Sequence, residues 1–341
     1  MNKLLVFIFF VFLLIEIKSQ NIEKNCFKVM CYNVENYFDC IDDSLTEDDE
    51  YLPTGIRAWN NEKYQTKQIN ISKVIAAVGA WESPALVGLC EIESRKCLTD
   101  ITKYSGLKNL GYKFLQHESP DARGVDVALL YQPNKFRPLH DEAIRINFPT
   151  APNSKTRDIL YVRGIMPTDD TLHVFVCHFP SRLGGELESE EKRMFVASVL
   201  RSKVDSIFVN GTHPNILIMG DFNDYPTNNS MLRVLYAQAP EKEISITKLY
   251  NLMYPIHLNE KGSHKHQGEW GALDQLIVSG NLLNPLNKIF TRVENAHVFE
   301  ADFLLENDEV FLGKQPFRTY KGMKYQGGFA DHLPVYLDLW Y

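Results

Sequence analysis

The sequence lacks the signatures of a structural metal site and of a strongly basic surface. None of its six cysteines forms a Cys-x-x-Cys pair, and no cysteine–histidine cluster has zinc-ligand spacing, so we expect no structural zinc. Lys and Arg together number 36 against 43 Asp and Glu, which gives a net charge of −7. So acidic a chain does not bind nucleic acid through bulk electrostatics. An enzyme that neutralises phosphate locally with a bound metal is still compatible with this charge.

Internal repeats, low-complexity tracts and linkers rich in proline, glycine and serine are also missing. With 45% hydrophobic and 23% charged residues, the composition is that of an ordinary globular protein, which excludes a disordered chain, a collagen or a coiled coil. We therefore expect one folded domain over residues 24–341.

The first twenty residues differ from the rest. Lys3 precedes twelve consecutive apolar residues, Leu4 to Ile15, and the small residue Ser19 follows them. A basic start, an apolar run of this length and a small residue are typical of a secretory signal peptide, and twelve residues are too few to span a bilayer comfortably. We expect residues 1–20 to be a signal peptide that exports the protein to the periplasm or the exterior, without stable membrane insertion. A retained anchor is the alternative.

Past this segment, short apolar runs alternate with helical stretches. Strand-like runs cover residues 27–32, 85–90, 112–117, 125–131, 158–165, 172–178, 215–220, 273–279 and 333–339. Helical spacing marks residues 66–80 and 188–208, and in the second of these Val196, Leu200 and Val204 share one apolar stripe. Two packed mixed sheets with outer helices, an α/β fold, fit this order.

Several reactive side chains have an ordinary structural explanation. We expect buried free thiols at three cysteines that lie in apolar runs, Cys31, Cys90 and Cys177. The pairing of the cysteines stays open, because export permits disulfides and the sequence assigns none. The acidic segment 39–50 is expected to be a solvated loop, and His264 and His266 are expected to be solvated in a polar loop.

The most informative pattern is the place where the apolar runs stop. Six of them end in residues that chemistry can use, namely Asn33 and Glu35, Glu91, His178, Asp221 and Asn223, Asp274, and Asp331 with His332. A single carboxylate after a strand is usually a turn or cap residue, but six such endings are harder to explain as turns. Strand ends on one side of a sandwich would bring these side chains into one cleft.

On these motifs the chain resembles the endonuclease/exonuclease/phosphatase superfamily, the DNase I-like metal-dependent phosphodiesterases. The matching segments follow the family's order: Tyr32-Asn33-Val34-Glu35-Asn36, Gly88-Leu89-Cys90-Glu91, Gly124-Val125-Asp126, His178-Phe179-Pro180-Ser181-Arg182, Gly220-Asp221-Phe222-Asn223-Asp224, Leu273-Asp274 and Ala330-Asp331-His332-Leu333-Pro334. The resemblance implies a four-layered α/β/β/α sandwich. It also implies a hydrolase of phosphodiester bonds with Mg²⁺ as cofactor, Mn²⁺ or Ca²⁺ being alternatives.

By this resemblance, four residues would hold the metal. Glu91 matches the family's principal Mg²⁺ ligand, and Asn33 lies beside it to bind metal or phosphate. Glu35 stands where some relatives have a further acidic contact, and Asp331 matches an additional carboxylate that contacts metal or water. Carboxylate and amide oxygens suit a hard cation that keeps several waters.

The resemblance assigns the catalytic chemistry to a second set of residues. Asp221 and Asn223 match the pair that orients the attacking water and the phosphate. His332 matches the catalytic histidine, and Asp274 matches the carboxylate that holds its ring and tautomer. In-line attack of the activated water would then give a phosphomonoester and a free hydroxyl, while the metal and the cationic histidine neutralise growing charge.

A second histidine and two arginines complete the implied site. His178 matches a histidine of the DNase I-like branch, and Asp126 is the candidate for its carboxylate partner. Arg123 and Arg182 flank matching motifs and are placed to reach a phosphate.

The substrate is less constrained than the reaction, because the superfamily contains DNases, abasic-site nucleases, sphingomyelinases and phosphoinositide phosphatases. Residues 33–39 resemble the N-terminal motif of secreted bacterial nucleases in this superfamily. Residues 316–325 interleave Arg318, Lys321 and Lys324 with aromatic residues that can stack on bases, although a core hairpin with solvated basic residues is the alternative there. No apolar hairpin of the kind that a membrane-lipid phosphodiesterase needs is evident. We expect a secreted endonuclease that acts on nucleic acid, with no protein partner inferable. A lipid or small-molecule phosphoesterase and a non-catalytic binding module are the alternatives.

Overall fold

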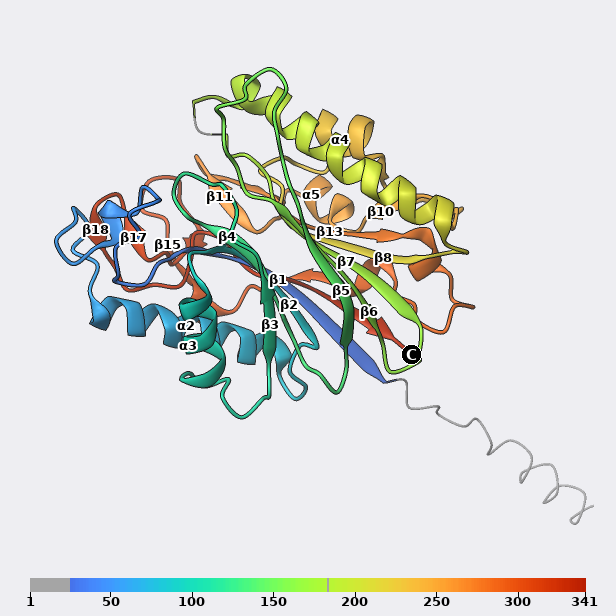
Figure 1. Cartoon of the computed structure of the whole chain (residues 1–341), viewed down its shortest axis with the longest axis horizontal. Coiled ribbons are helices and arrows are strands. Elements are labelled where there is room, and N and C mark those ends of the chain that lie inside the picture. Colours follow the sequence, from blue (N-terminus) through green and yellow to red (C-terminus); the bar gives the residue numbers. More distant parts are fainter. Residues whose placement is uncertain (1–24, 183) are drawn as a thin grey trace, which may run out of the picture.

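The computed structural model describes residues 25–182 and 184–341, so the predicted signal peptide, residues 1–20, lies outside the described residues. Two large mixed sheets pack face to face, with helices α2 (Asn61–Gly79) and α3 (Arg95–Lys103) on one outer side and α4 (Glu186–Asn210) on the other (Figure 1). The expected four-layered α/β/β/α sandwich is therefore confirmed. No helix among the described residues is both long and apolar enough to cross a membrane.

The first sheet carries the N-terminal half of the fold and the last strand. Its strands lie in the order β14 (Ala296–Val298), β19 (Val335–Trp340), β1 (Cys26–Tyr37), β2 (Leu86–Ile92), β4 (Asp126–Tyr131) and β3 (Lys113–Gln116). Strands β1 and β2 are parallel, whereas β19 and β4 run antiparallel to their neighbours β1 and β2.

The second sheet contains the middle of the chain. Its strands lie in the order β5 (Arg137–Ile144), β6 (Ile159–Ile165), β7 (Thr171–His178), β8 (Asn215–Asp221), β13 (Asp274–Ser279), β10 (Leu249–Asn251) and β9 (Ala237–Gln238). Strands β7 and β8 are parallel, and β13 runs antiparallel to β8.

Smaller elements fill the loops. Three two-stranded pairs are β11 (His264–His266) with β12 (Glu269–Gly271), β15 (Leu305–Asn307) with β16 (Lys314–Pro316), and β17 (Tyr320–Lys321) with β18 (Lys324–Tyr325). Short helices cover Asp49–Tyr51, Ser230–Leu235, α5 (Tyr254–Leu258), Gly280–Leu283, Val293–Asn295 and Asp302–Leu304.

The alternation of side chains along the strands builds three apolar layers. In β1, Val29 and Cys31 are buried between the two sheets, while Met30 and Tyr32 pack in the layer beneath α2 and α3. The apolar stripe predicted for 188–208 is buried against the outer face of the second sheet. The sheets come so close at Gly88 that an added Cβ would lie 2.9 Å from the Met219 side chain.

One expectation about loops holds in part and another is wrong. Most of the acidic segment is exposed, as expected, but Asp39 and Asp48 are 6% and 1% exposed, and Asp39 accepts hydrogen bonds from Ile41 N and Ser94 Oγ. An exposed apolar tip does exist on the β15–β16 hairpin, where Val310, Phe311 and Leu312 are 70%, 52% and 78% exposed. By contrast, the three cysteines expected to be free and buried are so.

Candidate active site

Parallel strands bring the first four site residues to one edge of the sandwich. Asn33 and Glu91 lie toward the carboxyl ends of β1 and β2, and His178 and Asp221 close β7 and β8. His178 and Asp221 are direct neighbours in the parallel register of the second sheet. Because the two sheets pack face to face, these ends meet across the interface.

Antiparallel strands bring the remaining residues to the same edge. Asp274 opens β13 and pairs in register with Asp221 at the end of β8. Asp331 and His332 directly precede β19, which runs antiparallel to β1 and therefore starts where β1 ends. The sequence pattern of strand endings thus predicted a real meeting point.

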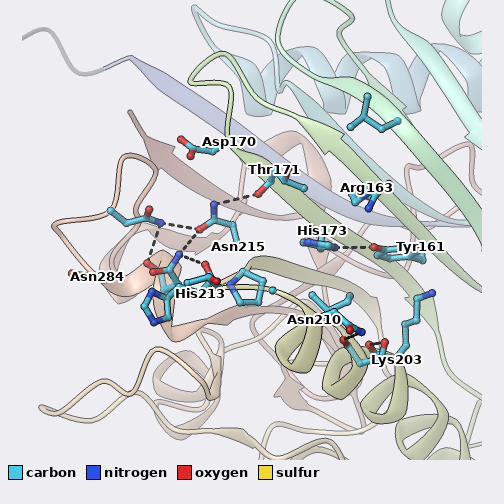
Figure 2. A pocket seen from close by; sticks show the side chains of 18 of the residues that line it. Tyr161, Arg163, Asp170, Thr171, His173, Lys203, Asn210, His213, Asn215 and Asn284 are labelled. Atoms are coloured by element: carbon cyan, nitrogen blue, oxygen red, sulfur yellow. Dashed lines mark hydrogen bonds between the residues drawn. The ribbon is translucent and has the colours of Figure 1, made fainter.

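The side chains line a pocket of about 350 Å³ at this edge. Its walls are formed by Asn33, Glu91, Arg123, Arg157, His178, Ser181, Arg182, Asp221, Asn223, Tyr225, His264, His266, Leu273, Asp331 and His332. A wider hollow of about 890 Å³ lies at the opposite strand ends, near Thr171 and Asn215 (Figure 2). Its lining contains none of the predicted site residues, and its asparagine side chains largely bond one another and nearby carbonyls. The chemistry therefore resides in the smaller pocket.

Local backbone conformation aims the carboxylates into the pocket. Glu91 has φ +66° at an irregularity in the β2–β4 pairing, and Asn223 has φ +48° just after β8. Non-glycine residues rarely adopt positive φ, and such strain gathers at functional sites. A bulge of this kind re-aims a side chain relative to a regular strand.

Asn33 joins two carboxylates at the centre of the site. Its Nδ2 donates to Asp221 Oδ2 at 3.0 Å and lies 3.5 Å from Glu91 Oε1, while its Oδ1 accepts from Glu35 N at 3.0 Å. Asn33 therefore presents a donor to the pocket, which suits phosphate oxygens and not a cation. Its expected role as a metal ligand is not what these contacts show. Asn223 holds Asp221 from the other side, because its backbone N donates to Asp221 Oδ1 at 2.9 Å.

His332 is fixed by Asp274, as the resemblance implied. The ring Nδ1 lies 2.6 Å from Asp274 Oδ2, and the opposite nitrogen Nε2 lies 3.8 Å from Asp221 Oδ2. Burial alone would lower the pKa of His332, but the charges of Asp274 and Asp221 outweigh it and hold that pKa well above the usual value. His332 is therefore an imidazolium at neutral pH. Burial raises the pKa of Asp221 to about 6, against the opposing charge of His332.

His178 lies at the site, but its predicted carboxylate partner does not. Nε2 of His178 lies 3.6 Å from Asp221 and 3.8 Å from Glu91, whereas its buried Nδ1 has no hydrogen-bond partner among the described residues. Asp126 instead accepts hydrogen bonds from Gln116 Nε2 and Ser119 N. The expected pairing of His178 with Asp126 is wrong. The order of residues in the sequence did not show in which direction the Asp126 side chain points. Burial, Arg157 and Arg123 lower the pKa of His178 well below its usual value, so its ring is neutral.

Glu35 belongs to a second layer behind the pocket. One carboxylate oxygen lies 3.0 Å from Arg318 Nη2 and the other accepts from Thr319 N at 2.8 Å. Arg318 also binds Asp331 at 2.9 Å, so it bridges the two carboxylates. Glu35 does not line the pocket that holds Glu91, so its expected role as a direct metal ligand is not what the structure shows. The stretch considered for base contacts has the features of the alternative, a core hairpin with solvated basic residues, since Tyr320 is 4% exposed while Lys321 and Lys324 are exposed to solvent.

Two functional side chains were not found from the sequence. Lys67 of α2 is fully buried, and its Nζ donates to Thr319 Oγ1 and to the carbonyl of Phe329. Burial lowers the pKa of Lys67 to about 8, and the charges of Glu35 and Asp331 oppose that shift. A lysine within a helical pattern gives no sequence signal that it is buried close to Glu35 and Asp331.

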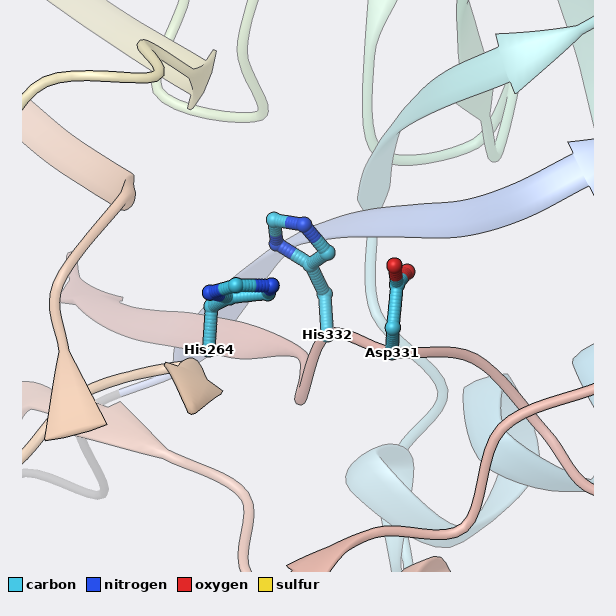
Figure 3. A group of neighbouring side chains, drawn as sticks. All are labelled: His264, Asp331 and His332. Carbon is cyan, nitrogen blue, oxygen red and sulfur yellow. The ribbon is translucent and has the colours of Figure 1, made fainter. Parts of the chain in front are cut away.

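His264 is the second, and the expectation that it is solvated is wrong. Its ring lies 4.7 Å from that of His332, centroid to centroid, and the two residues also form a backbone bridge. Figure 3 shows His332 between His264 and Asp331. Burial lowers the pKa of His264 to about 3, so a neutral ring lies beside the imidazolium. His266, its neighbour on β11, also lines the pocket.

The donor set fits a hard divalent cation. Glu91, Asp221 and Asp331 all present carboxylates to the same pocket, where their side chains are 13%, 2% and 23% exposed, and clustered carboxylates of low exposure are costly unless paired or bound to metal. Of the four predicted ligands, Asn33, Glu91 and Asp331 line the pocket, whereas Glu35 does not.

The chain that carries this site also matches a known protein family. A model of the endonuclease/exonuclease/phosphatase family matches residues 28–340. The chain belongs to this family. It is therefore a hydrolase of phosphoester bonds, in a superfamily that generally depends on divalent metal ions. No curated protein sequence matches the chain.

Solved structures of family members share the fold at low sequence identity. TDP2 of D. rerio in complex with a single-strand DNA product is 12% identical with a TM-score of 0.54, and the match covers 92% of this chain and 99% of that one. A mannosyl-6-phosphatase of Bacteroides thetaiotaomicron is 14% identical with a TM-score of 0.57, covering 92% and 100%. The human nocturnin catalytic domain with bound sulfate is 16% identical with a TM-score of 0.55, covering 94% and 98%.

Proposed function

We propose that the protein is an exported, Mg²⁺-dependent nuclease that cleaves phosphodiester bonds of nucleic acid. The observation that carries this proposal is the placement of Asp221 between two histidines in opposite charge states. Nε2 of the cationic His332 and of the neutral His178 lie 3.8 Å and 3.6 Å from the same carboxylate oxygen. The base Asp221 and the cation His332 therefore face the same reacting position.

The residues of the chain divide the work of hydrolysis. Asp221 accepts the proton of the attacking water, because a carboxylate with a pKa near the working pH is an efficient general base. The imidazolium of His332 donates a hydrogen bond to a non-bridging phosphate oxygen as negative charge grows there. A divalent cation held by Glu91 and Asp331, when bound, would supply Lewis-acid stabilisation of the phosphate and the leaving oxygen.

Positive charge in the pocket supports a polyanionic substrate. Arg123, Arg157 and Arg182 all line the pocket together with the carboxylates. Tyr225 is not a free platform for a base, since Arg182 lies over one face of its ring at 4.3 Å and His257 stacks on the ring at 4.8 Å. The arginines concentrate positive charge in a protein of net charge −7, as a nucleic-acid substrate requires locally.

A lipid phosphoesterase is the second candidate, and one observation favours it. The exposed tip Val310–Leu312 is tied to the hairpin that lines the pocket, because Lys265 of β11 donates to Asp308 and to the carbonyl of Leu312. Exposed apolar residues beside a pocket can contact a bilayer. Loss of activity on lipid vesicles in Phe311→Ser would assign the tip to that function.

The experiment that decides between them is hydrolysis by the purified protein of plasmid DNA, sphingomyelin vesicles and inositol phosphates in parallel. Each is run with Mg²⁺, with EDTA and with His332→Ala. His140→Ala is the matched control, since this histidine is 47% exposed and its one ion-pair partner is the surface residue Glu142. Cleavage of DNA alone, lost with EDTA and in His332→Ala, is the expected result. Intact DNA with another substrate cleaved would refute the nuclease assignment.

Export has a separate test. Residues 1–20 should be absent from the mature protein, which N-terminal sequencing of the protein recovered from the host's periplasm or medium would show. An intact N-terminus in the cell interior would contradict it.

A further inference from the structure

Two arginines on the wall of the pocket share one carboxylate. Asp121 accepts from Arg157 Nη1 at 3.1 Å, and its other oxygen lies 3.6 Å from Arg123 Nε. Both the Arg157 and the Asp121 side chains are buried, at 6% and 7% exposed, whereas Arg123 is 43% exposed. Two guanidinium groups against one carboxylate leave a net positive charge at this point of the wall.

This charge is built into the fold and is not a flexible surface feature. Arg157 also donates to the carbonyl of Phe179 at 2.6 Å, next to His178. Its Nε is buried and donates no hydrogen bond to any described residue. Arg157 is therefore held rigidly in the wall, and Arg123, whose side chain is 43% exposed, is the member of the pair that a ligand oxygen can reach.

The position of the pair relative to the reacting centre follows from its neighbours. Arg123 Nη1 lies 3.5 Å from Asn36 Oδ1, and Asn36 N donates to Glu91 Oε2 at 2.8 Å. Arg123 is therefore one residue away from the principal metal-ligand candidate. The charges of Arg157 and Arg123 also act on His178, whose pKa they lower. The pair thus lies next to Glu91 and His178, to one side of the cluster of carboxylates.

We propose that Arg123 and Arg157, joined through Asp121, form a subsite for a second phosphate group of the substrate. This inference rests on the proposed nuclease function and names what that site selects: substrates with a further phosphate one nucleotide from the scissile bond. Guanidinium groups bind phosphate through charge-assisted, often bidentate, hydrogen bonds. The second phosphate is either a terminal group or the next diester of a strand, and both offer the same oxygens.

Three chromogenic esters test the subsite. They are the p-nitrophenyl esters of thymidine 5′-monophosphate, of thymidine 3′,5′-bisphosphate and of the dinucleotide pTpT, cleaved at the 5′ phosphate in Mg²⁺. All three share one leaving group, so the ratio of kcat/KM between the first two reports only the added phosphate, whereas the third adds a phosphodiester together with a second thymidine. We expect the bisphosphate to be favoured over the monophosphate by about 10-fold or more, as a charge-assisted hydrogen bond supports. The dinucleotide ester distinguishes a strand diester from a terminal phosphate.

Arg123→Gln should remove most of this preference, and Arg157→Lys should reduce it. Arg163→Gln is the matched control, because Arg163 lines the other hollow and is exposed. Equal kcat/KM for the three esters in the unmodified protein would overturn the subsite while leaving the nuclease function intact. A preference that survives in Arg123→Gln would also overturn it. If no ester is cleaved, calorimetric titration of thymidine 3′,5′-bisphosphate against the 5′-monophosphate gives the same comparison, and equal affinities would reject the subsite.

Discussion

Asp274 holds the ring of His332 in place, with 2.6 Å between Asp274 Oδ2 and His332 Nδ1. The carboxylate is completely buried, and Ser263 Oγ donates to the same oxygen at 2.5 Å. One ring nitrogen is thereby committed to Asp274, which leaves Nε2 to face Asp221 and the substrate. Both the orientation and the charge of His332 depend on this one carboxylate.

Replacing Asp274 by Asn should therefore lower kcat by about 10²–10⁴-fold with a smaller change in KM. The amide keeps the shape of the side chain but removes the charge that holds His332 as an imidazolium. Steady-state kinetics, on the substrate that the parallel hydrolysis assay identifies, measures the change in kcat and KM. Asp141→Asn, at a half-exposed residue whose ion pair with His117 lies at the surface, should behave like the unmodified protein. An undiminished kcat in Asp274→Asn would show that His332 does not act as a cation.

The pH dependence of activity should follow Asp221 on its acid side. Its pKa of about 6 lies above the usual value because of burial. Below that pH the carboxyl group is protonated and cannot accept a proton from water, so kcat/KM should rise about tenfold per pH unit and level off above 6. His332 has a pKa well above its usual value and stays cationic through neutrality, so the fall on the alkaline side should come later. A profile from pH 4.5 to 9 that is already flat at its acid end, with no rise up to pH 6, would contradict the role of Asp221.

Removal of the Glu91 charge should weaken metal binding. The Glu91→Gln protein should need about 100-fold more Mg²⁺ for half-maximal activity, since even partners of metal ligands are worth 10–100-fold in affinity. Calorimetric titration with Mg²⁺ provides a readout independent of turnover. Glu82→Gln is the matched control, because this carboxylate is 51% exposed and pairs with Lys135 far from the pocket. An unchanged Mg²⁺ affinity would remove Glu91 from the ligand set.

The sequence predicted those parts of the fold that have strong periodicity. The central strands are continuous apolar runs because both faces are buried, and α4 shows one clear stripe. The helix α3 was missed because it is only nine residues long, too short a window for its one buried face to stand out, and β5 was missed because this edge strand contains a proline and several exposed residues. Propensity and pattern give little signal for such marginal elements.

The site residues also divide into those that the sequence pattern identified and those that it did not. The ends of the apolar runs identified Asp221, Asp274 and His332 as site residues, because the direction and register of the strands decide where those residues meet. The partners of Glu35 and His178 depended on long-range packing, such as the contact between residues 35 and 318. No local pattern contains that information, so the Glu35 and Asp126 assignments failed.

Lys67 is the clearest case of a role visible only in three dimensions, and its removal should destabilise the protein. Lys67→Met fills the same space without the charge. It leaves the Phe329 carbonyl without its lysine donor, and it removes one of the two cations, Lys67 and Arg318, that act on the buried Glu35. Breaking a buried charge network of this kind costs about 3 kcal/mol or more in free energy of unfolding. Urea denaturation followed by circular dichroism should show a lower midpoint with an unchanged slope. Lys103→Met, at an exposed residue of α3, should leave the free energy of unfolding within about 0.5 kcal/mol of the original value. Equal midpoints for the two variants would mean that Glu35 and Asp331 need no compensation from Lys67, and the carboxylates would then have to be neutral in the folded protein.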